Sequence, residues 1–157
     1  MEGNFSVFNA TSSENVSGAL AANTTFYLHA GLQPNTTYQA YVQVSSDSLT
    51  LNSGTTLHVT LAAVPTSLYS PTQTNSILQS DWDEAGNPAN TIFSLERSPN
   101  GSSGWITLVA QSTYSNYTDT PLDEYTTYYY RARSINHAGV YSDYTANLAT
   151  NTLWIAP

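Results

Sequence analysis

The feature that most constrains the fold of this 157-residue chain is an internal repeat with a period of about 90 residues. The stretch LQPNTTY begins at residue 32 and LDEYTTY begins at residue 122, so the two lie 90 residues apart. A second pair, TLAAVP at residue 60 and TLWIAP at residue 152, is separated by 92 residues. Two independent pairs that agree to within a short loop insertion indicate a true repeat, and about 90 residues is enough to bury a core.

The pattern of side chains within the repeats predicts an all-β fold. Short runs rich in β-branched and aromatic residues alternate with Gly, Pro and Asn, and no stretch has the periodicity of an amphipathic helix. The clearest strand is TTYYYRARS, residues 126–134, where Tyr128, Tyr130 and Ala132 alternate with more polar positions. Because successive side chains of a strand point to opposite faces, these three residues are expected in a core.

The charge composition excludes several classes of partner. The chain has 11 acidic residues against three arginines, for a net charge of −8, and no lysine. Nucleic-acid binding requires a basic patch, which these residues do not supply. Anionic lipid surfaces are disfavoured for the same reason, and no apolar run approaches the roughly 18 residues of a membrane-spanning helix, so no membrane insertion is expected. Cysteine is absent, which removes disulfides and thiolate chemistry.

The uncharged polar surface, rich in Ser, Thr and Asn, is typical of proteins outside cells. Seven Asn-X-Ser/Thr patterns are candidate glycosylation sites: Asn4, Asn9, Asn15, Asn23, Asn35, Asn100 and Asn116. The N-terminal MEGNFSVFNA has neither the cationic nor the apolar region of a signal peptide. An extracellular or cell-surface location is therefore expected for a fragment or a processed form.

The second repeat resembles a fibronectin type III domain, a seven-stranded sandwich of sheets ABE and CC′FG. SILQSDW (76–82) resembles strand B with Trp82 as the core tryptophan, and TIFSLERS (91–98) resembles strand C. A Leu followed six residues later by a Tyr resembles the tyrosine corner, whose phenol bonds back to the main chain; the two pairs are Leu122 with Tyr128 and Leu32 with Tyr38. The resemblance implies tandem immunoglobulin-like (fibronectin type III) β-sandwiches.

Applied to the first repeat, the same pattern places strand C at 5–11, E at 24–32, F at 36–44 and G at 55–62, and leaves no residues for A and B. The expected domains are a partial one over residues 1–63, a complete one over 64–152, and the start of a linker over 153–157. Strand E would then have an unpaired edge that favours self-association through the incomplete first domain. The missing strands come either from the rest of a longer chain or from another copy, whose TLWIAP segment would supply a strand and whose Trp154 would supply a core plug.

No constellation of residues predicts catalysis, a metal or a cofactor. The three histidines, His29, His58 and His137, are far apart and none of them has zinc-site spacing relative to another. The acidic stretch DWDEAGN (81–87) lacks the full ligand pattern of a calcium loop. The chain is not expected to be an enzyme.

Two surfaces are candidates for partner binding. In the family it resembles, ligands most often meet the B–C and F–G loops, and the matching residues are Asp83, Glu84, Asn87, His137, Tyr141 and Asp143. The outward side of strand F offers Tyr129, Arg131 and Arg133, although pairing of the arginines with Glu96 explains them equally well.

These features favour a non-catalytic structural or adhesion module of a cell-surface or filamentous protein, acting as a rigid spacer that presents loops to a protein or glycan at the cell surface. The alternative is an accessory spacer or carbohydrate-binding segment of a secreted polysaccharide-degrading enzyme. The tripeptide Arg-Gly-Asp is missing, so integrin recognition of that kind is not expected.

Overall fold

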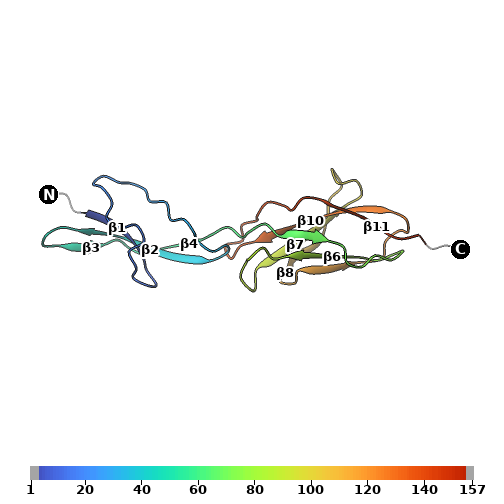
Figure 1. The fold of residues 1–157 in the computed structure, drawn as a ribbon, viewed down its shortest axis with the longest axis horizontal. Helices are drawn as coiled ribbons and strands as arrows, with labels where there is room; N and C mark the ends of the chain where they lie inside the picture. Colours follow the sequence, from blue (N-terminus) through green and yellow to red (C-terminus); the bar gives the residue numbers. More distant parts are fainter. Residues whose placement is uncertain (1–3, 155–157) are drawn as a thin grey trace. The chain divides into compact units, whose positions relative to one another are not determined.

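The structure, a computed structural model, describes residues 4–154, which form eleven β-strands and no helix. Contacts divide the chain into two compact units, residues 1–60 and 61–157 (Figure 1). All pairings between neighbouring strands are antiparallel. The predicted all-β fold class is confirmed, and residues 4–154 contain no candidate for a membrane-spanning helix.

The second unit is a sandwich of two sheets. One sheet has the order β5 (Thr66–Tyr69), β6 (Leu78–Asp83) and β9 (Asn116–Asp119). The other has the order β11 (Leu148–Asn151), β10 (Thr127–Ile135), β7 (Ile92–Ser98) and β8 (Ile106–Ser112). In the lettering of the fold that the second repeat resembles, these are sheets ABE and GFCC′.

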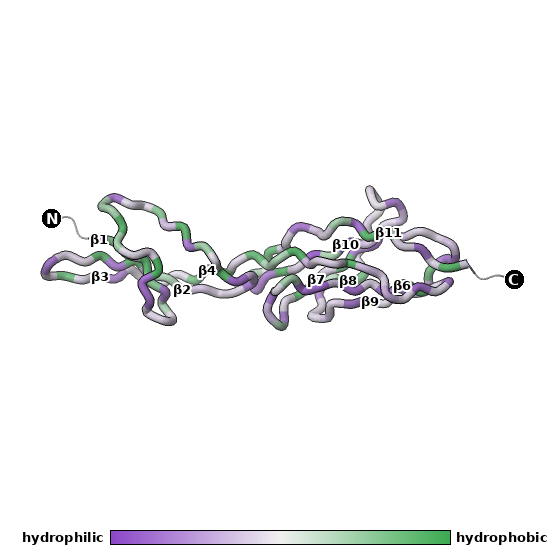
Figure 2. The backbone as a smooth tube through the Cα atoms, viewed as in Figure 1, coloured by the Kyte–Doolittle hydropathy of each residue, from purple (hydrophilic) through white to green (hydrophobic). Residues whose placement is uncertain are grey.

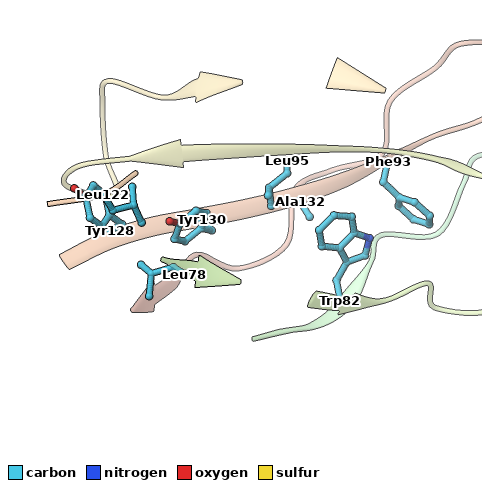
Figure 3. Close-up of a cluster of buried hydrophobic side chains, with 8 residues drawn as sticks. All are labelled: Leu78, Trp82, Phe93, Leu95, Leu122, Tyr128, Tyr130 and Ala132. Atoms are coloured by element: carbon cyan, nitrogen blue, oxygen red, sulfur yellow. The ribbon is translucent and has the colours of Figure 1, made fainter. Parts of the chain in front are cut away.

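The core of the second unit lies between these sheets, because each strand turns its apolar side chains inward. Along β10, Tyr128, Tyr130 and Ala132 are buried and alternate with half-buried positions. Figure 3 shows Trp82 of β6 beside Ala132 and Phe93, and the Trp82 and Phe93 rings meet edge to face with centroids 5.9 Å apart. Full burial of a large apolar side chain contributes roughly 1.5–3 kcal/mol, so this cluster holds the two sheets together.

An ion pair between a half-buried arginine and a buried carboxylate also joins the two sheets of the second unit. Nη1 of Arg97 on β7 donates to both carboxylate oxygens of Asp119 on β9, at 2.9 and 2.8 Å. The hydroxyl of Tyr130 donates to the same carboxylate at 2.8 Å. Burial and this hydrogen bond raise the pKa of Tyr130 above its usual range. The carboxylate of Asp119 therefore has both a cation and a hydroxyl donor, which a buried charge requires.

Each repeat has a tyrosine whose phenol fixes the chain that leads into its strand. The Tyr128 hydroxyl accepts a hydrogen bond from the main-chain N–H of Asp123 at 3.1 Å. In the first unit the Tyr38 hydroxyl accepts one from the N–H of Gln33 at 2.9 Å. The matching Leu122 is part of the buried core. The repeated sequence motif LxxxTTY thus corresponds to the same local structure in both units.

The first unit is a single sheet. Its central strand β2 (Thr37–Ser45) pairs with β1 (Asn4–Asn9) on one side. On the other side it pairs in succession with β3 (Thr50–Asn52) and β4 (Thr56–Val59). β1, β2 and β4 overlap the ranges expected for strands C (5–11), F (36–44) and G (55–62), and β3 lies outside all three ranges. No second sheet covers this one within residues 4–60.

The strand E expected at residues 24–32 of the first unit is not formed. These residues form an irregular segment between β1 and β2, and the chain between those strands has only isolated bridges, at Asn15 and Leu20. The physical reason is pairing: in the second unit the corresponding strand β9 bonds to β6, and residues 4–60 contain no strand equivalent to β6. An extended segment without a ladder partner does not become a strand.

Substitution of Tyr128 by Phe tests the contribution of the tyrosine corner. The change removes the acceptor for the Asp123 N–H and keeps the ring in the core, so we expect a loss of about 0.5–1.5 kcal/mol in the free energy of unfolding. Urea unfolding followed by tryptophan fluorescence measures it. Tyr125→Phe is the control, because Tyr125 is exposed and its hydroxyl makes no hydrogen bond within residues 4–154. Equal stability of the two variants would contradict a role for this bond.

Candidate functional site

The outward face of β10 carries a stack of alternating aromatic rings and arginines. The guanidinium of Arg131 lies 4.0 Å from the centre of the Trp105 ring and 3.8 Å from that of Tyr144. The guanidinium of Arg133 lies 4.5 Å from the Tyr144 ring and 3.8 Å from the Tyr141 ring. Contacts of this kind contribute roughly 0.5–2 kcal/mol each, depending on exposure to water. Both arginines are therefore engaged by the protein's own rings.

Glu96 on β7 accepts hydrogen bonds from two members of this stack. It lies directly opposite Arg131 in the ladder of β7 and β10. Nε and Nη2 of Arg131 donate to its Oε2 at 2.9 and 2.7 Å, and the Tyr144 hydroxyl donates to its Oε1 at 2.7 Å. Burial raises the pKa of Glu96, but the hydrogen bonds from Tyr144 and Arg131 outweigh it and hold the pKa below its usual value. Burial and the bond to Glu96 raise the pKa of Tyr144.

Tyr129, a candidate for stacking on a ligand, is in contact with the turn between β7 and β8. Gly101 in that turn has a φ of 73°, and a Cβ built on it would lie 2.7 Å from Cδ1 of Tyr129. The side-chain amide of Asn147 donates to the Gly101 carbonyl at 2.8 Å and holds the turn in place. The turn therefore covers part of the ring that a ligand would need.

The loop residue Asn87 is buried and ties its loop to the segment before β5. Its amide donates to the carbonyls of Ala63 at 2.9 Å and Glu84 at 2.7 Å, and its Oδ1 accepts from the Ala63 N–H at 2.8 Å. The Ser134 hydroxyl also donates to the Ala63 carbonyl, at 2.7 Å. Asn87 is thus a structural residue whose side chain does not face solvent.

The remaining loop candidates differ in exposure. Asp83, His137 and Asp143 are exposed, Glu84 is half-buried, and Tyr141 belongs to the aromatic stack. Asp83 accepts a hydrogen bond from the N–H of Ala85 at 2.6 Å, which shapes the turn after β6. Within residues 4–154, no three His, Asp or Glu side chains are grouped so that they could hold a metal ion.

The candidate glycosylation sites also separate by exposure. Asn35 is fully buried, so the folded chain does not offer it to a glycan. Asn4, Asn15, Asn23, Asn100 and Asn116 are exposed, and Asn9 is half-buried. The Oδ1 atoms of Asn9, Asn15 and Asn100 accept main-chain hydrogen bonds within their turns.

The residues of the stack differ in whether their role can be predicted from the sequence. The pairing of Glu96 with arginine is predictable, because both belong to strands whose alternation is clear. Neither Trp105 nor Tyr144 is predicted from the sequence as a partner of these arginines. Tyr144 lies outside the strands, in the chain between β10 and β11, so no periodicity marks it. The turn over Tyr129 is signalled only by the pair Asn100-Gly101.

Comparison with known proteins supports the fold and adds no activity. Neither a protein-family model nor a curated protein sequence matches the chain. A two-domain fibronectin type III segment of chicken tenascin is similar in structure, with a TM-score of 0.64 and 11% identity over 97% of this chain and 85% of that chain.

Two further solved structures are similar. The fibronectin type III domain of human fibronectin type III domain containing protein 3 has a TM-score of 0.50 and 19% identity, over 59% of this chain and 86% of that chain. The FN1–FN3 domains of chicken CNTN1 have a TM-score of 0.52 and 15% identity, over 96% of this chain and 56% of that chain. The chain therefore has a tandem fibronectin type III fold, as the repeated motifs predict.

Replacing Glu96 by Gln tests the electrostatics of the stack. Because the pKa of Glu96 is lower in the folded than in the unfolded chain, its carboxylate adds stability above the unfolded pKa, and this is lost as the pH falls through the folded pKa. We expect the wild type to lose more of its free energy of unfolding than Glu96→Gln between about pH 5 and 3. Urea unfolding across this range measures the difference, with Glu124→Gln as an exposed control. Parallel profiles for wild type and Glu96→Gln would contradict the prediction.

Alanine substitution of Gly101 tests the contact with Tyr129. Gly86 is a matched control, since it has the same φ of 73° and no heavy atom within 4 Å of the place that a methyl group would take. Both changes place alanine in left-handed backbone, at about 1–2 kcal/mol. Only Gly101→Ala also forces a methyl into the Tyr129 ring, so it should lose roughly 1–3 kcal/mol more in chemical denaturation. Equal losses of unfolding free energy in the two variants would contradict the prediction, because they would show that the turn moves away from the Tyr129 ring at no cost.

Proposed function

We propose that the chain is a non-catalytic extracellular module that acts as a rigid spacer and presents loops to a protein or glycan at the cell surface. The observation that carries this proposal is that the charged groups on the outward face of β10 are bound by the protein's own side chains. Its arginines are bound by aromatic rings and Glu96, which stiffens the sheet and leaves no unpaired nucleophile or base there. Rigid strands that support exposed loops suit a module of this kind.

The loops at the ends of β6 and β10 are the proposed contact region. Asp83, His137 and Asp143 are exposed there. Two hydrogen bonds between Asn87 and Ala63 fix the loop after β6. Fixed loops lose little conformational freedom on binding, which favours affinity. The exposed Asn-X-Ser/Thr sites and the uncharged polar surface support a location outside the cell, in a cell-surface, adhesive or filamentous protein.

Cell adhesion to surfaces coated with the 157-residue chain tests this function. We expect adhesion that falls several-fold in the triple variant Asp83→Ala, His137→Ala, Asp143→Ala, because side chains at the centre of a contact carry most of its energy. The control is Asp123→Ala with Glu124→Ala, two exposed residues on the connection from β9 to β10. Adhesion that is absent, or equal for both variants, would contradict the proposed contact region.

Two outcomes would replace this function by another. Retention of the chain on insoluble polysaccharides would favour an accessory segment of a polysaccharide-degrading enzyme; the turn over Tyr129 argues against a stacking platform on that face. Turnover of a substrate that disappears in His137→Ala or Asp83→Ala would overturn the non-catalytic assignment.

A further inference from the structure

Arg133 differs from the other two arginines of the chain because it has no carboxylate partner. Arg97 pairs with Asp119 at 2.8 Å. Arg131 pairs with Glu96 at 2.7 Å. Within the described part of the chain, Arg133 forms no ion pair and donates no hydrogen bond. Since the chain has three arginines and no lysine, Arg133 is the one permanent cation of the described residues whose charge is not paired.

The aromatic rings around Arg133 hold its guanidinium in one place. Its Cζ lies 3.8 Å from the centre of the Tyr141 ring and 4.5 Å from that of the Tyr144 ring. Both rings belong to the segment between β10 and β11, two strands that are labelled in Figure 2, where hydrophilic residues are coloured purple. The Ser142 N–H donates to the Ser134 carbonyl at 2.9 Å, and the Ser134 N–H donates to the Ser142 hydroxyl at 3.0 Å. These bonds tie the segment to β10, so the guanidinium loses little freedom when it binds a ligand.

The N–H groups at the end of the Arg133 side chain are the ones left for a ligand. Nε is buried and has no acceptor. Nη1 and Nη2 likewise have no acceptor within residues 4–154 and, unlike Nε, keep contact with solvent. The rings interact with the flat faces of the guanidinium, whereas its N–H groups lie in its plane. A planar carboxylate can therefore accept from both Nη atoms without displacing a contact of the protein.

The acidic residues near Arg133 do not pair with it. The two carboxylate oxygens of Glu96 accept hydrogen bonds from Arg131 and from the Tyr144 hydroxyl. Asp143 is exposed and forms no ion pair within residues 4–154. A carboxylate for Arg133 is thus left to another molecule.

Exposed apolar side chains stand next to this cation. Val140 is 48% exposed and directly precedes Tyr141, which is 47% exposed. The Val140 N–H donates to Oδ1 of Asn136 at 2.8 Å, and the Asn136 N–H donates to the Val140 carbonyl at 2.9 Å, which closes the turn that carries Val140. A single unpaired cation beside apolar side chains matches one acidic side chain with an apolar neighbour. A polyanion needs several cations, and the net charge of −8 repels it.

We propose that Arg133 binds the carboxylate of an Asp or Glu side chain of a protein partner, at a position where an apolar residue is adjacent to that acid. The carboxylate oxygens accept hydrogen bonds from Nη1 and Nη2, and the apolar residue packs on Val140 and Tyr141. This inference rests on the proposed function, because it names the chemistry by which the module meets a protein partner. One ion pair and a small apolar contact give an isolated peptide a dissociation constant on the order of millimolar, which added salt raises.

Nuclear magnetic resonance of the 157-residue chain with ¹⁵N-labelled arginine tests the proposal. The probe is a capped tripeptide with a leucine on each side of a glutamate, at about pH 7, where the glutamate is ionised. The tripeptide with glutamine in its place is the uncharged control. The guanidinium signals of Arg133 should shift with the first peptide only, while those of Arg97 and Arg131 stay unchanged because both are paired internally. No shift at about 20 mM peptide, or equal shifts with both peptides, would overturn the proposal.

Substitutions of Arg133 test the charge and the geometry separately. Arg133→Gln should abolish binding, followed by the main-chain amide signal of Tyr141. Arg133→Lys keeps the charge but loses the pair of parallel N–H groups, so binding should weaken by about threefold or more. Tyr125→Ala, which removes an exposed tyrosine elsewhere, should bind like the wild type. Binding that survives Arg133→Gln would show that the carboxylate lies elsewhere; the amide spectrum of each variant checks that it is folded.

Methyl glucuronide, a sugar with one carboxylate, separates a protein ligand from a glycan. It should bind more weakly than the glutamate tripeptide, because it offers no apolar side chain to Val140 and Tyr141. Binding as tight as that of the tripeptide, or tighter, would overturn the assignment to a protein side chain. The titration uses no cells, so its failure is distinguishable from a failure of the adhesion expected for the proposed function.

Discussion

An antiparallel sheet that is apolar on one face has to cover that face, and both units of this chain are organised by how they meet this requirement. In the second unit the sheet of β6 and its neighbours covers the sheet of β7 and β10, and Trp82 against Phe93 is the centre of that cover. In the first unit the equivalent face carries Val42 partly open to water. One repeat has strand β9 because β6 pairs with it, and residues 4–60 contain no strand equivalent to β6 that could pair with the segment 24–32.

Charged groups in the second unit are paired both between the two sheets and on the outer face of one of them. Asp119 is buried between the sheets and receives both Arg97 and the Tyr130 hydroxyl. On the outer face Glu96 receives Arg131 and the Tyr144 hydroxyl. Arg133 lies over the rings of Tyr141 and Tyr144, in the chain between β10 and β11. Each of the three arginines is thus in contact with side chains of the protein itself.

The sequence predicted the parts of the fold that depend on local alternation and on the repeat. The inward side of β10 follows from the alternation of Tyr128, Tyr130 and Ala132. The two tyrosine corners and the strand order of the second unit were implied by the resemblance to a fibronectin type III domain. What could not be predicted depends on partners distant in the chain. The 24–32 segment has a strand-like composition, but a strand also needs a neighbouring strand to pair with. Asn87 was predicted to be an exposed loop residue, because its hydrogen bonds to Ala63 join positions far apart in the sequence.

If the cover of the inner face determines how stable each unit is, amide hydrogen exchange measured by mass spectrometry tests this most directly. In dilute solution β2 and residues 25–31 should exchange much faster than β10, because an uncovered sheet opens at little cost. Equal protection of β2 and β10 would contradict the dependence of stability on cover.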